Sequence, residues 1–255
     1  MLDSKKKVLA FTLAEVLITL GIIGVVAALT IPSLINYAFE REAVSALKKN
    51  YSVLSDAVTK WQMDNDCLGD SYACPEYGAS YENNAVGVAR GIAPYLKYTQ
   101  VYHGPSEAVG KAISWLPDTA YLISGVTMSY ANWLTLLPDK NQIQYGMGSY
   151  FLLTDGTTLI LTGAHHLYFF IIDINGPKKP NRIGKDIFIA SIWTPNHKTF
   201  SPYSMNGYGS ASAYGVCGDT ATNICNPDDG KSPTAYVLKY DKLPNFKSMG
   251  YPNTP

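Results

Sequence analysis

The sequence predicts an α+β protein in which a long N-terminal helix packs on an antiparallel β-sheet head. Three observations carry this prediction. No charged residue occurs from Val16 to Phe39, so the chain begins with a long apolar segment. The residues that follow repeat apolar side chains at helical spacing. From residue 121 onward, short runs of β-branched and aromatic residues alternate with turn residues, which is typical of strands.

The composition favours an extracytoplasmic protein and excludes several functions. The 255 residues suffice for one sizeable domain with an appendage. Charged residues make up only 16% and the net charge is +0, so no long-range field calls for nucleic acid. A low charge together with 19 Tyr suits an extracytoplasmic surface. The chain has no G-x-S-x-G, H-E-x-x-H or P-loop motif, so we do not expect an enzyme.

The apolar segment from Phe11 to Ile31 is long enough to cross a membrane. As a helix it rises roughly 30 Å, which is the thickness of the hydrocarbon core. Lys5–Lys7 precede it and predict a cytoplasmic N-terminus. A cleaved secretory signal is disfavoured because the run is too long and Ile31–Leu34 is a poor cleavage site. An ordinary anchor fits the length but leaves Glu15 unexplained.

The residues AFTLAEVLITLGIIGVVAALTIPSLI resemble the N-terminus of type IV prepilins and type II secretion pseudopilins. That family has a short basic leader, a cleavage point before a Phe, a Glu five residues into the mature chain, and an unbroken apolar helix. The resemblance implies that a prepilin peptidase cuts between Ala10 and Phe11 and that Phe11 becomes N-methylated. The family usually has Gly before the cut, where this chain has Ala10.

The resemblance also implies a pilin-like architecture and a set of partners. Its parts are a leader at 1–10, a helix at 11–65 whose residues 11–32 form the transmembrane part and filament core, and a head at 66–255. The residues implied in filament assembly are Phe11, Glu15, Gly24 and Pro32. The implied partners are other subunits in a helical homo- or hetero-polymer, prepilin peptidase, an inner-membrane platform protein, an assembly ATPase, and membrane lipid before assembly.

The position of Glu15 has a physical explanation in this family. A carboxylate near the bilayer centre costs about 2.5–3.5 kcal/mol, so it normally has a partner. In one chain Glu15 can reach the first N–H groups of its helix. Between chains, the family mechanism pairs this Glu with the N-terminal amine of a neighbouring subunit, which sets the stagger of the helices. The alternative is a Glu whose carboxylate reaches the membrane surface near a helix end.

Beyond Pro32 the helix is predicted to become amphipathic and to end at about Asp64 or Asn65, with Gly69 as a stop signal. We expect one face to cover a sheet. The apolar stripe on that face consists of Tyr37, Val44, Leu47, Tyr51, Leu54, Val58 and Trp61.

The four cysteines fall into two local pairs, Cys67 with Cys74 and Cys217 with Cys225. Neither pair has C-x-x-C spacing, so a zinc or redox motif is disfavoured. Two local disulfides in an oxidising compartment are the preferred interpretation, and four buried reduced thiols are the alternative.

The head is predicted to combine two short helices with an antiparallel meander. The helical candidates lie at 83–97 and 106–117, and the strand candidates lie at 121–130, 149–154, 157–162, 167–174 and 186–193. Asp155-Gly156 is a strong hairpin signal between two apolar runs. Residues 235–241 are a candidate late strand, and 200–234 read as a long surface loop.

The loop DINGPKKPNRIGKDIF, residues 173–188, is a candidate calcium site. It resembles a segment common in pseudopilin-like heads, some of which carry calcium in a C-terminal loop. Asp173, Asn175 and Asp186 supply oxygen atoms, which Ca²⁺ prefers. Asp, Asn and Gly also form turns without any metal, so this alternative stays open.

We therefore expect a structural subunit of a type II secretion pseudopilus or a type IV pilus-like filament. It would be a single-pass inner-membrane protein with an extracytoplasmic head, and later part of a periplasmic or cell-surface filament. The alternative is a minor or tip pilin that acts as a binding module in adhesion or DNA uptake, with residues 200–234 as its contact surface.

Overall fold

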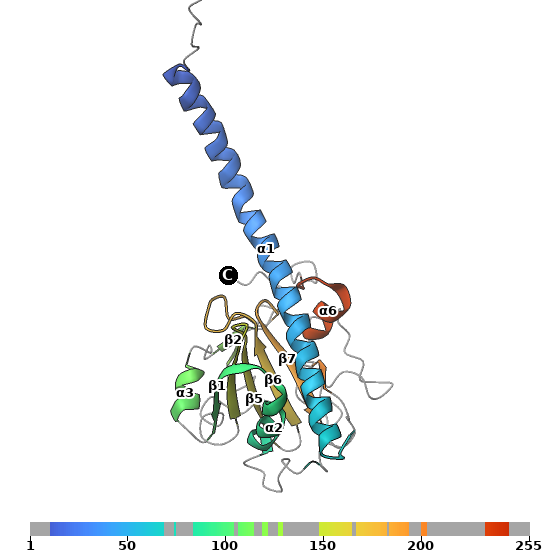
Figure 1. The fold of residues 1–255 in the computed structure, drawn as a ribbon. Helices are drawn as coiled ribbons and strands as arrows, with labels where there is room; N and C mark the ends of the chain where they lie inside the picture. The colour runs from blue at the N-terminus through green and yellow to red at the C-terminus, as the bar shows by residue number, and fades with distance from the viewer. Residues whose placement is uncertain are drawn as a thin grey trace, which may run out of the picture. The chain divides into compact units, whose positions relative to one another are not determined.

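A computed structural model of the chain consists of two compact units, residues 1–41 and 42–255, which meet within one continuous helix (Figure 1). Each unit is described by itself. The residues that the structure describes are 11–68, 74, 84–104, 107–114, 119–121, 127–129, 148–164, 167–182, 184–193, 200–202 and 233–244.

Helix α1 spans Leu13–Asp64 and supplies all the described structure of the first unit apart from Phe11 and Thr12. Its large apolar side chains are exposed from Leu13 to Tyr37. An 18-residue window of this helix has a mean hydropathy of 2.3, and none of the residues in that window is buried. By length and composition this helix could therefore cross a membrane. The helix continues through Pro32, which lacks an N–H group for the usual bond to the carbonyl four residues earlier.

In the second unit α1 presents one apolar face to the core. Val44, Leu47, Leu54, Val58 and Trp61 are buried, and Tyr51 packs partly buried against them. The predicted stripe is therefore confirmed from Val44 onward. Tyr37 is exposed and belongs to the first unit, so the stripe is shorter than the sequence suggested.

The predicted end of α1 at Asp64 is confirmed, but the residue that stops the helix differs. Asp66 has a φ of 55°, and the N–H of Cys67 donates to the carbonyl of Gln62 at 2.9 Å. A left-handed residue that redirects the chain and satisfies a terminal carbonyl is a common helix C-cap, and Asp tolerates it better than most residues. Gly69, the stop that the sequence indicated, lies outside the described residues.

The head contains a six-stranded antiparallel sheet in the order β1-β4-β5-β6-β7-β8, and a separate pair of short strands. The bounds are β1 Tyr98–His103, β2 Thr119–Tyr121, β3 Thr127–Ser129, β4 Gly148–Leu153, β5 Thr158–Ala164, β6 Leu167–Asp173, β7 Ile187–Trp193 and β8 Ser201–Pro202. The predicted meander of four strands is confirmed as β4 to β7, and the fold class is α+β as expected.

The hairpin predicted at Asp155-Gly156 joins β4 to β5. Gly156 has a φ of 87°, a conformation that glycine adopts without strain. The Asp155 carboxylate accepts the N–H of Thr157 at 3.0 Å, which is the local bond expected of Asp in a turn.

Two strand predictions were wrong and two strands were missed, β1 and the two-residue β8 within the expected 200–234 loop. Residues 121–130 form no single strand; β2 and β3 pair with each other instead, and the turn signal Ser124-Gly125 lies between them in the sequence. Residues 235–241 are not a strand but fall mostly in helix α6, Pro233–Tyr240, with Pro at its favoured first position. Strand β1 lies in a region expected to be loops and helices, and its first three residues are exposed.

The predicted helices between residues 83 and 117 are confirmed as α2 Asn84–Ile92, the short 3₁₀ turn η3 Ala93–Tyr95, and α3 Glu107–Ala112. One face of the sheet, α1 and α2 share a single buried cluster. The members of this cluster from β4 to β7 are Phe151, Leu153, Leu159, Leu161, Tyr168, Phe170, Ile172, Phe188, Ala190 and Ile192.

Helix α6 protects an edge of the sheet. The Thr234 hydroxyl accepts the N–H of Ile189 at 3.1 Å and donates to the carbonyl of the same residue at 2.8 Å. These are the outward-facing backbone groups of β7 that a neighbouring strand would otherwise bind. A side chain thus completes the edge where β8 is too short to reach.

Close packing of α2 on α1 generates a prediction. A Cβ added at Gly91 would lie 2.3 Å from the Trp61 indole Nε1, so the buried Trp61 ring would have to move. We expect Gly91→Ala to lower the free energy of unfolding by about 1–3 kcal/mol, the usual cost of overpacking a core. Chemical denaturation measures the change.

Gly21→Ala is the matched control, because no atom lies within 4 Å of its added Cβ. The free energy of unfolding of the head should equal that of the wild type in this variant. A Gly91→Ala protein as stable as the wild type would mean that the indole has room to move, contrary to this packing.

Candidate functional site

The N-terminal candidate site is built around Thr12 and Glu15 at the start of α1. The Glu15 Oε2 atom accepts the backbone N–H of Thr12 and its hydroxyl, both at 2.8 Å, and the N–H of Glu15 donates to the Thr12 hydroxyl at 3.2 Å. This reciprocal pattern is a capping box, in which two helix-terminal groups are satisfied by side chains. Bonding of Glu15 to N–H groups of the first turn was expected from the sequence, but the part of Thr12 was missed, although the T-x-x-E spacing was there to read.

Only half of the Glu15 carboxylate is used by the capping box. Both Thr12 bonds end on Oε2, and no bond of Oε1 is present among the described residues. No Lys, Arg or His of the described part of the chain forms an ion pair with Glu15. Its neighbour Phe11 is 84% exposed, and Ala10 lies outside the described residues. The helix thus begins with a capped carboxylate that keeps one oxygen open.

The rest of the apolar segment satisfies its own polar side chains. The hydroxyls of Thr19, Thr30 and Ser33 donate to carbonyls three or four residues earlier, at 3.0, 2.9 and 2.8 Å. Such bonds let hydroxyl groups sit in a helix without an outside partner. A Cβ added at Gly24 would have no atom within 4 Å, so the surface at this glycine is open to another helix.

One of the two predicted disulfides is confirmed. Cys67 and Cys74 are joined and both side chains are buried in the core cluster just beyond the end of α1. Cys217 and Cys225 lie outside the described residues, as does most of the predicted 200–234 surface loop.

The second candidate site is the β6–β7 loop, where Asp186 organises the backbone. Its carboxylate accepts the N–H of Asn181 at 2.8 Å and that of Arg182 at 2.6 Å, and the side-chain amide of Asn175 at 3.3 Å. Asp186 is fully buried, and burial raises its pKa while these hydrogen bonds oppose the rise. The residue therefore acts as a turn former, the alternative that the sequence left open.

Asp173 lies at the end of β6, beside that loop, and is only partly satisfied. Its Oδ1 atom accepts the N–H of Asn175 at 3.1 Å, whereas Oδ2 is buried with no hydrogen-bond partner. Burial, with a smaller contribution from the nearby Asp186 carboxylate, raises the pKa of Asp173 to about 8. A carboxyl group in such surroundings holds its proton at neutral pH.

Two further buried oxygens near Asp173 lack partners: Asn175 Oδ1 and the Thr158 hydroxyl. Thr158 is the register partner of Asp173 on β5, and its hydroxyl is 3.3 Å from the Cβ position of Gly176. Thr158 was missed as a site residue in the sequence, because only the pairing of β5 with β6 brings it to this loop.

A carboxylate, an amide and a hydroxyl oxygen are donors that suit Ca²⁺, but three are fewer than the six to eight that it takes. The Asp186 oxygens already accept N–H groups. In the part of the chain that the structure describes, no three His, Cys, Asp or Glu side chains gather where they could hold a metal. The loop as observed is a hydrogen-bonded turn with three spare oxygens.

Comparison with known proteins finds no matching family model, no matching curated protein and no matching solved structure.

The buried Asp173 generates a pH prediction. Its folded pKa of about 8 is far above the value near 3.9 expected for an unfolded Asp, so between these values the folded chain holds a proton that the unfolded chain has lost. Stability therefore falls as the pH rises from about 4 to about 8. Urea denaturation across this range should show the fall, and Asp173→Asn should flatten it.

Asp56→Asn is the control, because this Asp is exposed and forms no ion pair with any described residue, so it should leave the pH dependence unchanged. A stability that rises between pH 4 and pH 8, or an Asp173→Asn protein with the wild-type slope, contradicts the assignment.

Proposed function

We propose that the chain is the membrane-inserted precursor of a filament subunit, trimmed before Phe11 and polymerised through its N-terminal helix. The observation that carries the proposal is the single carboxylate of Glu15 in the exposed apolar part of α1, which has no other charged residue before Glu40. A plain membrane anchor gains nothing from a group that costs about 2.5–3.5 kcal/mol in hydrocarbon. A polymer gains a means of fixing how its helices align.

The partner of Glu15 in this proposal is created by processing. Cleavage after Ala10 leaves a free α-amine on Phe11, and the open Oε1 atom of Glu15 in an incoming subunit receives this amine from a neighbour. The capping box can stay intact, since its bonds end on Oε2. In a dry helix bundle a wrong stagger leaves both charges unpaired, which is strongly unfavourable. The pair therefore selects one register.

The surface of the segment supports close association between subunits. Gly21 and Gly24 lie on an exposed helix with nothing within 4 Å of either Cβ position. Small residues allow membrane helices to approach closely, where packing contacts drive their association. The same segment would hold the precursor in the inner membrane, with the head outside the cytoplasm.

Glu15→Gln separates the two roles of this residue. Gln keeps a capping box but carries no charge. We expect Glu15→Gln to be inserted and cleaved as the wild type is, while assembled filaments fall at least about tenfold, since an unpaired buried charge costs several kcal/mol. The matched variant Thr12→Val removes the hydroxyl bonds and keeps the charge, and its filaments should persist. Immunogold labelling and sheared-fraction blots measure assembly.

Mass spectrometry of the mature N-terminus controls for processing. Each variant should begin with N-methylated Phe11, and any other N-terminus contradicts the cleavage between Ala10 and Phe11. Wild-type filament levels in Glu15→Gln would show that the charge does not set the register.

We further propose that the three unpartnered oxygens of Thr158, Asp173 and Asn175 bind Ca²⁺, with water completing the coordination. The supporting observation is that all three are buried without a hydrogen-bond partner, which is costly unless a ligand satisfies them. Asp173 must lose its proton to bind, so the affinity for Ca²⁺ should rise with pH.

Thermal unfolding with millimolar Ca²⁺ against a chelator tests this proposal. We expect the midpoint to rise by several degrees with Ca²⁺, in line with mass-action stabilisation by a ligand at about 100 times its Kd. Asp173→Asn should abolish the rise, and Mg²⁺ should act weakly because it demands a tighter octahedral shell. An unchanged midpoint in the wild type overturns calcium binding and leaves the turn.

A further inference from the structure

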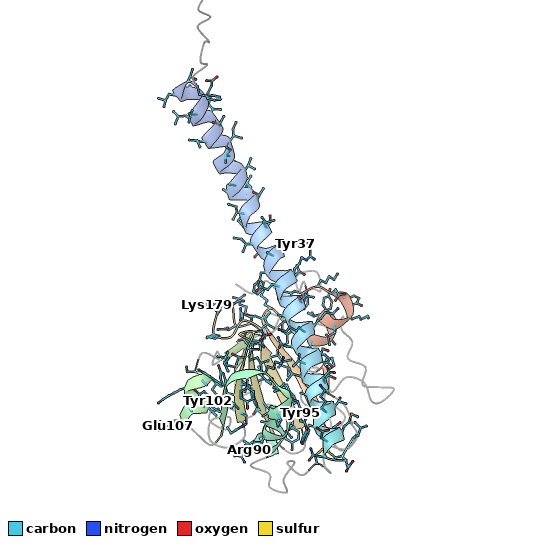
Figure 2. The ribbon with its side chains drawn as sticks, viewed as in Figure 1. Tyr37, Arg90, Tyr95, Tyr102, Glu107 and Lys179 are labelled. Atoms are coloured by element: carbon cyan, nitrogen blue, oxygen red, sulfur yellow. A yellow bond between two sulfur atoms is a disulfide. The ribbon has the colours of Figure 1, made fainter. Side chains whose placement is uncertain are left out.

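The exposed charges of the β6–β7 loop are all basic. Lys178, Lys179 and Lys185 are exposed and Arg182 is partly exposed, whereas the acids that flank the loop, Asp173 and Asp186, are fully buried. Lys179 and Lys185 form no ion pair with any described residue. Figure 2 shows Lys179 on this loop, beyond the ends of the strands. Lys179 and Lys185 therefore present positive charge to the solvent without an ion-pair partner among the described residues.

Helix α6 adds a second group of basic and aromatic side chains. Lys239 lies 4.7 Å from the ring centroid of Tyr240, and Lys242 lies 5.9 Å from the rings of both Tyr236 and Tyr240. Tyr236 is buried, whereas Tyr240 is exposed. Tyr240 with Lys239 and Lys242 is the combination found at membrane–water interfaces, where the ring lies at headgroup level and the cations face phosphates. We call the six residues Lys178, Lys179, Arg182, Lys185, Lys239 and Lys242 the basic collar.

Both parts of the collar adjoin the same turn of α1. The Gly176 Cβ position is 3.4 Å from the carbonyl of Gly156, and Asp155 of that hairpin pairs with Lys49 at 2.9 Å. On the other side, Asp241 just after the end of α6 pairs with Lys48. The loop, through the β4–β5 hairpin, and α6, through Asp241, thus both connect to the Lys48–Lys49 turn of α1, in the second unit that begins at Glu42.

We propose that the basic collar binds the anionic phospholipid headgroups of the membrane that holds the apolar segment. This inference rests on the proposed membrane insertion. Pro32 and Glu42 are only ten positions apart in the chain, a stretch that spans about 15 Å as a helix and at most about 35 Å when fully extended, whatever the angle between the two units. A surface beside Glu42 is therefore kept close to the bilayer, where its charge meets lipid phosphates at high effective concentration.

The nearby acids do not cancel the collar. Asp241 and Asp155 are paired with Lys48 and Lys49, and Asp173 and Asp186 are fully buried. Among the described residues near the collar, Glu42 is the exposed acid without an ion-pair partner, and it lies at the start of the second unit. The collar would hold the head against the membrane before assembly, and pulling a subunit into a filament would have to release it.

Hydrogen exchange of the full chain in nanodiscs tests the proposal. In discs of phosphatidylcholine with about 30% phosphatidylglycerol, amides in residues 174–186 and 233–244 should exchange at least about threefold more slowly than in pure phosphatidylcholine. Salt at about 0.5 M should remove the difference, because it screens charges beyond a few ångströms. Exchange of the core strand β5 should be the same in both lipids.

Lys179→Gln combined with Lys185→Gln should abolish the slowing, since neither lysine has an ion-pair partner among the described residues whose loss would disturb the fold. Lys60→Gln combined with Lys111→Gln changes the net charge equally away from the collar and should keep the wild-type response. Equal exchange in both lipids, or slowing that survives high salt, overturns the collar while leaving the filament proposal intact. A chain that does not enter the discs overturns the membrane insertion itself.

Discussion

Burial of one face of α1 against the sheet is the constraint on which the second unit depends. Leu47, Leu54 and Trp61 are almost completely buried on that face, and each such side chain contributes about 1.5–3 kcal/mol on leaving water. The face also carries Asn50, whose amide donates to Thr157 at 2.9 Å and to Asp155 at 3.2 Å. This buried polar contact fixes where the helix meets the β4–β5 hairpin, and everything that adjoins the hairpin is positioned with it.

The first unit, in contrast, is not stabilised by burial of apolar side chains. Its part of α1 buries no large apolar side chain, yet its polar groups find partners within the helix, through the capping box of Thr12 and Glu15 and the hydroxyl bonds of Thr19, Thr30 and Ser33. A segment that satisfies its own hydrogen bonds can leave water at little polar cost, which is the requirement for entering lipid. In the described part of this segment two groups depart from this rule: the carbonyl of Ala28, which Pro32 deprives of its usual N–H partner, and the open oxygen of Glu15, which the proposed assembly uses.

Local signals account for the elements that the sequence predicted. The hairpin at Asp155-Gly156, the end of α1 near Asp64 and the strands β4 to β7 each follow from residues within a few positions of one another. The misses have equally physical causes. Strand β1 buries none of its residues fully and lies among residues that read as loop, and α6 is too short for its periodicity to outweigh its β-branched and aromatic content. Its helical state is fixed by packing on β7 through Thr234.

The candidate sites divide in the same way. The sequence alone determined the long apolar helix with its single early carboxylate, the Cys67–Cys74 pair and the Asp, Asn and Gly residues of the β6–β7 loop, because each is a matter of residue type and local spacing. Only the tertiary structure decided that Thr158 stands beside Asp173, that Asp186 is spent on backbone N–H groups, and that the basic loop and α6 adjoin the same turn of α1. The contacts of Thr158 and of α6 join residues far apart in the chain and depend on strand register and helix packing, which no short stretch of sequence encodes. The bonds of Asp186 span only four and five residues, but the residue types there allow several turns and do not specify which N–H groups the carboxylate accepts.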